Sequence, residues 1–261
     1  MNLYERDYNV ILNEDERNAL VEELSYENKP GIKNTSKYPR FSHPKEEVRR
    51  FIWHKISFFP NNHLNRFEVI NLNHGQEKES FKKVIYSAKN ENEIQRYIKE
   101  NRKWFIPGSI YREYNFGHHD AYLFPEQSLG AEYIADYMLL GKNSDGYSLV
   151  IVEFEKANVE FMLRSSNSES ESVRKGITQI RDWKRWLDDN RNYFLNSSGL
   201  RDKGIDVPTT RIYYCLVVSR RDLMSQKAKD LRSQMIYENQ NLKIISYDRL
   251  LDNILQLKNG Y

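Results

Sequence analysis

The most informative part of the chain is the stretch Ala135-Asp-Tyr-Met-Leu-Leu-Gly-Lys-Asn-Ser-Asp-Gly-Tyr-Ser-Leu-Val-Ile-Val-Glu-Phe-Glu-Lys156. Two apolar segments, residues 133–140 and 147–155, are rich in the aromatic and β-branched residues that strands favour. Between them lies Gly141-Lys-Asn-Ser-Asp-Gly146, whose composition is typical of a tight turn. The stretch therefore predicts an antiparallel hairpin.

Three acids lie on this hairpin, at the ends of the strands remote from the turn. Side chains alternate along a strand, so Glu153 and Glu155 share the face of Ile151, whereas Lys156 lies on the other face. Antiparallel pairing brings Asp136 close to both glutamates. Like charges at close range repel unless a cation intervenes, and oxygen ligands suit Mg²⁺ or Mn²⁺. The three acids thus predict a metal site for phosphodiester hydrolysis.

Other interpretations of these residues remain open at this stage. Acids at strand ends are often solvated residues that deter edge pairing, and Glu155-Lys156 also fits plain surface charge. A β-bulge would turn Lys156 toward the acids, which makes it a second-rank candidate. Glu132 has the strand parity of Asp136 but lies about 13 Å away in an extended strand, so it is a second-rank ligand.

The remaining pattern predicts an α/β fold in which helices flank a mixed central sheet. Asn90, with Glu93 three residues later, is typical of a helix start, and Asp248 is the expected N-cap of the last helix. The other expected helices cover residues 173–187 and 223–235. The other expected strands cover residues 109–116, 121–124, 211–219 and 242–247.

Residues 1–89 have a less regular pattern, with short aromatic segments at 50–53, 67–71 and 84–86 separated by Asn, Pro and Gly. Such punctuation favours short strands within a small mixed α+β module. The expected domain organisation is therefore an N-terminal module over residues 1–89 and a larger α/β domain over residues 90–261.

Composition excludes several classes of protein. The 261 residues carry 40 Lys+Arg against 37 Asp+Glu, so the formal net charge of +3 is too balanced to indicate nucleic-acid binding by itself. No segment approaches the roughly 18 to 20 apolar residues of a membrane span. The single cysteine, Cys215, excludes an intramolecular disulfide and a four-cysteine zinc site. We therefore expect a soluble cytoplasmic protein.

Four segments resemble a known family in their order along the chain. They are Gly130-Ala-Glu-Tyr-Ile-Ala-Asp136, Val150-Ile-Val-Glu-Phe-Glu-Lys156, Gln179-Ile-Arg-Asp-Trp183 and Ile244-Ile-Ser-Tyr-Asp248. Together they resemble the PD-(D/E)XK nuclease superfamily and, more narrowly, the Shedu family of bacterial anti-phage nucleases, over about residues 90–257. The resemblance implies a restriction-endonuclease-like core, a homo-oligomer, and a DNA nuclease with Mg²⁺ or a similar ion held by Asp136 and Glu153.

The chain departs from the superfamily pattern at one position. Most members have a lysine two residues after the second acid, where it orients the attacking water, and this chain has Glu155. Some members carry glutamate there and remain active, so Glu155 could ligate the metal or accept a proton from water. The resemblance also implies that Gln179 hydrogen-bonds the water, a metal ligand or the scissile phosphate. Without the resemblance, a solvated amide explains Gln179 equally well.

Basic residues near these motifs suit contacts to DNA phosphates that do not read the base sequence. Lys175, Arg181 and Lys184 lie on the expected helix, and Arg220 and Arg221 follow the expected strand. A solvated charged face is the alternative. Two functions are then possible: a metal-dependent DNA endonuclease of anti-phage defence, or a catalytically weak or inactive nuclease-fold protein that binds DNA or a partner protein. The missing lysine keeps the second function open.

Overall fold

The computed structural model describes residues 72–261 and a few single residues before them. These are Glu14, Asn18, Val21, Glu22, Ser25, Lys45, Phe59, His63, Leu64 and Val69. The strands expected at 50–53 and 67–71 lie outside the described residues, apart from Val69. The N-terminal module therefore stays a prediction.

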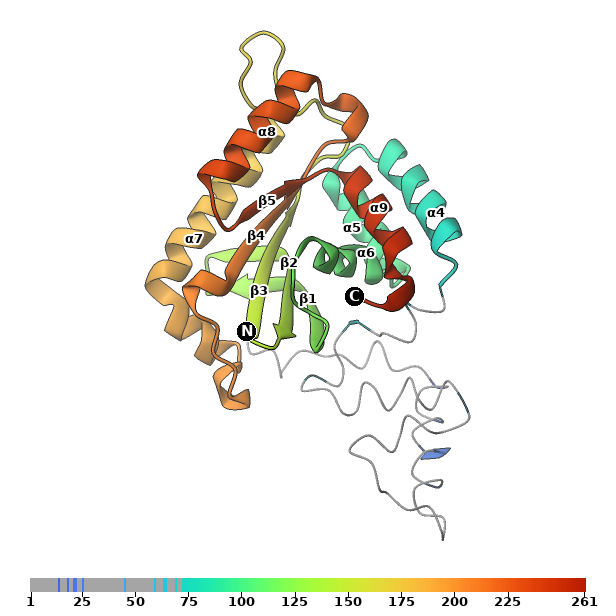
Figure 1. Ribbon diagram of the computed structural model, residues 1–261, viewed down its shortest axis with the longest axis vertical. Coiled ribbons are helices and arrows are strands. Elements are labelled where there is room, and N and C mark those ends of the chain that lie inside the picture. Colours follow the sequence, from blue (N-terminus) through green and yellow to red (C-terminus); the bar gives the residue numbers. More distant parts are fainter. Residues whose placement is uncertain are drawn as a thin grey trace.

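A five-stranded mixed sheet forms the centre of the described region (Figure 1). Its order is β1-β2-β3-β4-β5, with antiparallel pairing of β1 to β2 and of β2 to β3, and parallel pairing of β3 to β4 and of β4 to β5. The strands are β1 (Asp120–Leu129), β2 (Tyr133–Asn143), β3 (Gly146–Phe154), β4 (Ile212–Val217) and β5 (Leu242–Ile245). The expected α/β class with a mixed central sheet is confirmed.

Helices cover both faces of this sheet (Figure 1). One face packs against α7 (Glu171–Ser197) and α8 (Gln226–Glu238). The other face packs against α4 (His74–Ser87), α5 (Glu91–Glu100), α6 (Phe105–Gly108) and α9 (Tyr247–Gln256). Short 3-10 helices lie at η4 (Ser109–Glu113), η5 (Arg201–Lys203), η6 (Thr209–Arg211), η7 (Arg221–Leu223) and η8 (Leu257–Asn259). None of the helices in the described part of the chain is long and apolar enough to cross a membrane.

The hairpin formed by β2 and β3 has the predicted geometry. Its strands pair from Asn143 with Gly146 at the turn to Tyr137 with Val152 at the far end. Gly146 has φ of +118°, a conformation that side chains rarely adopt and that allows this tight reversal. Because the pairing ends at Tyr137 and Val152, the next residue on each strand is an acid. The register therefore brings Asp136 beside Glu153.

Three local expectations were wrong. Residues 84–86 form the last turn of α4 rather than a strand, with Ile85 buried between the helices and the sheet. Residues 109–113 form a 3-10 helix, because burial of Tyr111 and the hydrogen bonds of its hydroxyl with backbone groups of Tyr122 outweigh strand propensity there. The last helix begins with Ser246 as its N-cap, since Asp248 accepts a hydrogen bond from Arg221 N instead.

Candidate active site

The three acids of the hairpin lie close together at the side of β2 and β3 that is remote from the turn. Asp136 Oδ2 accepts a hydrogen bond of 2.7 Å from Phe154 N, which joins β2 and β3 just beyond their last paired residues. Glu153 is 4% exposed and Glu155 only 1% exposed. Glu155 N donates to Val217 O, so β3 stays in register with β4 beyond its last strand residue and forms no bulge there. Lys156 is exposed, which agrees with the predicted strand alternation.

Burial of these carboxyl groups disfavours their charged forms, and the surrounding hydrogen bonds and cations do not fully offset this effect. Burial raises the pKa of Glu153 to about 10, and the neighbouring charges of Asp136 and Glu155 contribute in the same direction. Burial also raises the pKa of Asp136 to about 6, although hydrogen bonds from Phe154 N and the Gln95 side chain oppose that rise. The Glu153 carboxyl therefore holds a proton at neutral pH unless a cation offsets the repulsion.

A lysine from α7 enters this cluster. Lys175 Nζ lies 2.9 Å from Glu155 Oε1 and 3.6 Å from Glu91 Oε1. Burial lowers the pKa of Lys175, but the pairing with Glu155 and the charges of Glu91 and Glu153 together raise it above its ordinary value. The sequence had suggested Lys175 as a DNA contact. Its position also brings its ammonium group into contact with the acids, at a point where the strand itself carries no lysine.

Two residues of α5 belong to the site and were not predicted. Gln95 hydrogen-bonds the side chain of Asp136, and Glu91 acts electrostatically on all three acids of the hairpin. Glu91 Oε2 is buried and has no hydrogen-bond partner among the described residues. Their spacing of four residues places both on one face of α5, which was the available signal. The helix start was recognised from Asn90 and Glu93, but nothing local shows which face meets the hairpin.

The structure places the other candidates less centrally. Gln179 is half-buried on α7, one turn after Lys175 and on the same face, but within the described region it makes no hydrogen bond to the acids. Glu132 is exposed in the turn between β1 and β2, rather than on a strand beside Asp136. Lys156 is turned away from the acids.

The remaining basic candidates fall into two groups. Arg181 and Lys184 are exposed on α7. Arg220 lies over the ring of Tyr86, with its guanidinium carbon 3.9 Å from the ring centroid, and pairs with Asp222. Arg221 Nη2 lies 2.5 Å from Asp252 Oδ2. The two arginines after β4 are thus engaged within the protein, whereas the two residues on α7 face solvent.

The donor set suits a magnesium ion only in part. Among the residues that the structure describes, no group of three or more His, Cys, Asp or Glu is placed to hold a metal ion. Glu155 is engaged by Lys175, which leaves Asp136 and Glu153. Glu153 Oε2 is buried and has no hydrogen-bond partner in the described region. Mg²⁺ commonly uses one or two carboxylates and completes its shell with water and substrate phosphates, so this pair fits it.

These features define the class of protein: an α/β protein with a mixed sheet and a largely buried carboxylate cluster where the pairing of β2 with β3 ends. Residues 88–251 match the family described as Shedu protein SduA, C-terminal, so the chain belongs to the Shedu family. No curated protein matches the sequence.

A solved structure, restriction endonuclease FokI bound to DNA, is similar with a TM-score of 0.38 and 12% sequence identity. The match covers 72% of this chain and 31% of that one, so this chain spans about a third of the length of that protein. A likeness this distant carries no argument about the function of this chain.

Proposed function

We propose that this protein is a metal-dependent DNA endonuclease that hydrolyses phosphodiester bonds in bacterial anti-phage defence. The observation that carries the proposal is the pair formed by half-buried Asp136 and buried Glu153, with an unpartnered oxygen on Glu153, in a chain of the Shedu family. A raised pKa in a group of mutually repelling carboxyls is typical of functional sites. The proposed cofactor is Mg²⁺, with Mn²⁺ as its substitute.

Each residue of the cluster has a role in this proposal. Asp136 and Glu153 would hold the ion, which when bound polarises the phosphate and lowers the pKa of a bound water. Phe154 N and the Gln95 side chain orient the Asp136 carboxylate. Glu155 Oε1 holds the Lys175 ammonium at 2.9 Å, so that its remaining N–H groups can donate to a phosphate oxygen or to the attacking water. Gln179, one turn along α7, is the proposed second donor.

The proposed substrate is DNA, bound without strong sequence preference. The exposed Arg181 and Lys184 on α7 are the proposed contacts to DNA phosphates, which supply affinity without reading the base sequence. We further propose that the protein acts in the cytoplasm as a homo-oligomer. Light scattering on the full chain would measure the assembly, and a monomer at micromolar concentration would contradict it.

A second function has one observation in its favour. Position 155 carries a carboxylate that is neutralised by Lys175, and such an ion pair can also serve only to stabilise the fold. A catalytically weak or inactive protein that binds DNA or a partner protein through the retained fold would have this arrangement. The two functions differ in whether the purified chain cuts DNA.

The test is a cleavage assay with linear and circular DNA in the presence of Mg²⁺, Mn²⁺ or EDTA. We expect cleavage with either metal and none with EDTA. Asp136→Ala and Glu153→Ala should each abolish cleavage while circular dichroism shows an unchanged fold, because a single remaining carboxylate holds the ion poorly. Glu132→Ala, in the exposed turn, is the control and should retain activity. Cleavage by either acid variant at the parental rate would refute this site.

A further inference from the structure

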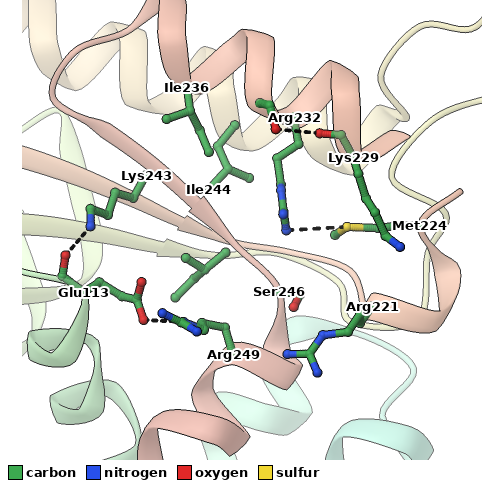
Figure 2. A pocket seen from close by; sticks show the side chains of 12 residues that line it. Glu113, Arg221, Met224, Lys229, Arg232, Ile236, Lys243, Ile244, Ser246 and Arg249 are labelled. Carbon is green, nitrogen blue, oxygen red and sulfur yellow. Dashed lines mark hydrogen bonds and ion pairs between the residues drawn. The ribbon is translucent and has the colours of Figure 1, made fainter. Parts of the chain in front are cut away.

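A second candidate binding site lies beside β5, the last strand of the described sheet, away from the acid cluster. A cavity of about 470 Å³ opens there between α8, η7 and the first turn of α9 (Figure 2). None of the three hairpin acids lines it. Since β5 is two strands from β3, the cavity is roughly 10 Å or more from Glu155. Its volume is in the range of small-molecule sites.

The lining of this cavity is strongly basic. Five cationic side chains line it: Arg221, Lys229, Arg232, Lys243 and Arg249. Glu113 is the single acid of the lining, and it is already engaged: its carboxylate pairs with Arg249 at 2.6 Å and its carbonyl accepts from Lys243. These three residues form the left side of the cavity in Figure 2.

The two cations of α8 lack a carboxylate partner. Lys229 and Arg232 make no ion pair with any described residue, and Arg232 Nε is buried with no hydrogen-bond partner. The contact of Arg232 Nη1 with Met224 Sδ, at 3.8 Å, is weak. Burial and the nearby charge of Arg221 lower the pKa of Arg232. Figure 2 shows the Lys229 and Arg232 side chains reaching from α8 toward Arg221. Cations that share a cavity repel one another, and an anion bound between them would offset this repulsion.

The rest of the lining is suited to a ligand with a second, less polar part. Ile236 of α8 and Ile244 of β5 give the cavity an apolar wall. Ser246, at the rim, is the N-cap of the ten-residue α9, and its side chain makes no capping hydrogen bond. The positive end of a helix adds to the attraction that the cations exert on an anion.

We propose that this cavity binds a free nucleotide, with its base against Ile236 and Ile244 and its phosphates held mainly by Lys229 and Arg232. Arg221, which also pairs with Asp252, borders the phosphates on the side opposite α8. A DNA backbone fits the observations less well, because the cations surround a hollow with an apolar wall instead of lying along an open face. The proposal does not depend on the nuclease activity, since no residue of the acid cluster takes part.

The test is the binding of ATP to the full chain in EDTA, measured by isothermal titration calorimetry. EDTA excludes binding through a metal at the acid cluster. Lys229→Met and Arg232→Met should each weaken ATP binding at least about tenfold, since each removes a charge-assisted hydrogen bond. Lys229 is only half-buried, so its variant is expected to fold even if Arg232→Met does not. Lys227→Met, exposed on the same helix and outside the cavity, is the matched control and should bind as the parent does.

Competition experiments test whether the cavity recognises the phosphates of ATP. Pyrophosphate should displace ATP, and adenosine, which has no phosphate, should not. Glu153→Gln should bind ATP normally, so failure of the nuclease proposal would leave this one standing. The nucleotide proposal would be overturned if the parent bound no ATP. It would also be overturned if Lys229→Met, Arg232→Met and the control Lys227→Met all bound ATP equally. A loss of duplex DNA binding in Lys229→Met and Arg232→Met without ATP binding by the parent would overturn it as well, because the cavity would then be a DNA contact.

Discussion

At the scale of single residues, the important departure is at position 155. The strand carries a glutamate where most of the superfamily resembled by this chain has a lysine, and the nearest ammonium comes from α7 instead. Lys175 Nζ and Glu155 Oε1 are 2.9 Å apart, so the pair presents one positive and one negative group beside Asp136 and Glu153. In the proposed function, Lys175 takes the role that a strand lysine has in most of that superfamily.

The first prediction concerns this pair. Lys175→Met and Glu155→Gln should each reduce the rate of DNA cleavage on the order of 100-fold or more, as expected for loss of a positioned proton donor or of the group that orients it. Lys156→Met should reduce the cleavage rate much less, because Lys156 is exposed on the other face of the strand. Rates would be measured under single-turnover conditions. An inactive Lys156→Met beside a nearly normal Lys175→Met would show that the role belongs to Lys156 and not to Lys175.

The second prediction concerns the pH dependence of stability without metal. The pKa of Glu153 is about 10 in the folded protein, above its ordinary value, so between these values the folded state binds more protons than the unfolded state. The free energy of unfolding should therefore fall as the pH rises from about 5 to about 9. Glu153→Gln removes this carboxyl, so the free energy of unfolding of this variant should fall less over the same pH interval. Urea midpoints at several pH values in EDTA would show the difference; parallel curves would contradict it.

At the scale of elements, the approach of α7 to the sheet shapes the site. Gly176 lies next to Lys175, where the helix backbone packs closely against Leu216 of β4 and against Glu155. A Cβ at this position would lie 2.5 Å from Leu216 Cδ1 and 3.1 Å from Glu155 Cγ. Leu216 is fully buried, so it cannot move aside easily. The absence of a side chain at position 176 thus allows the helix to hold Lys175 against the acids.

The third prediction rests on this contact. Gly176→Ala should destabilise the protein, because overpacking of about 1–3 kcal/mol exceeds the roughly 1 kcal/mol that alanine gains in a helix. It should also reduce cleavage, since α7 and Lys175 are displaced together. Gly75→Ala is the matched control in α4, where the nearest heavy atom is 3.7 Å away, and should be neutral or slightly stabilising. Chemical denaturation and the cleavage assay would measure both effects, and a Gly176→Ala protein as stable and active as the parent would refute the contact.

At the scale of the whole molecule, the sheet separates two apolar cores, and the cluster sits where strands and helices of both layers meet. Glu153 and Glu155 share their strand face with Ile151, in the core beneath α7, whereas Glu91 and Gln95 come from α5 on the opposite layer. A cation bound between strand ends would therefore hold together parts from several layers. Ligands that bind only the folded state stabilise it as a whole.

The fourth prediction is a metal-dependent rise in thermal stability. Saturating Mg²⁺ should raise the melting temperature of the parent by several degrees, since binding at about 100 times the dissociation constant adds roughly 2.7 kcal/mol. Asp136→Asn should show little or no shift, because one of the two carboxylates is lost. Scanning calorimetry with Mg²⁺ and with EDTA would compare the two proteins. Equal shifts in both would exclude the cluster as the binding site.

Local sequence was sufficient for part of this protein. The hairpin, the alternation that puts Glu153 and Glu155 on one face, and the Asn90 cap of α5 all depend on neighbours within a few residues, and all three were predicted. The turn is shorter than the expected segment 141–146, because the strands stay paired up to Asn143 and Gly146. The segment at 109–116 was not, because long-range burial of Tyr111 outweighed its local strand propensity.

Tertiary structure alone decided which other residues join the acids. Glu91, Gln95 and Lys175 reach the cluster from two helices, and the rotation of a helix about its axis depends on packing against residues far along the chain. The basic cavity beside β5 has the same origin, since its cations come from η7, α8, β5 and α9. Strand parity is a property of the backbone and can be read locally. Proximity between separate elements arises only when the apolar faces of helices and sheet are buried together.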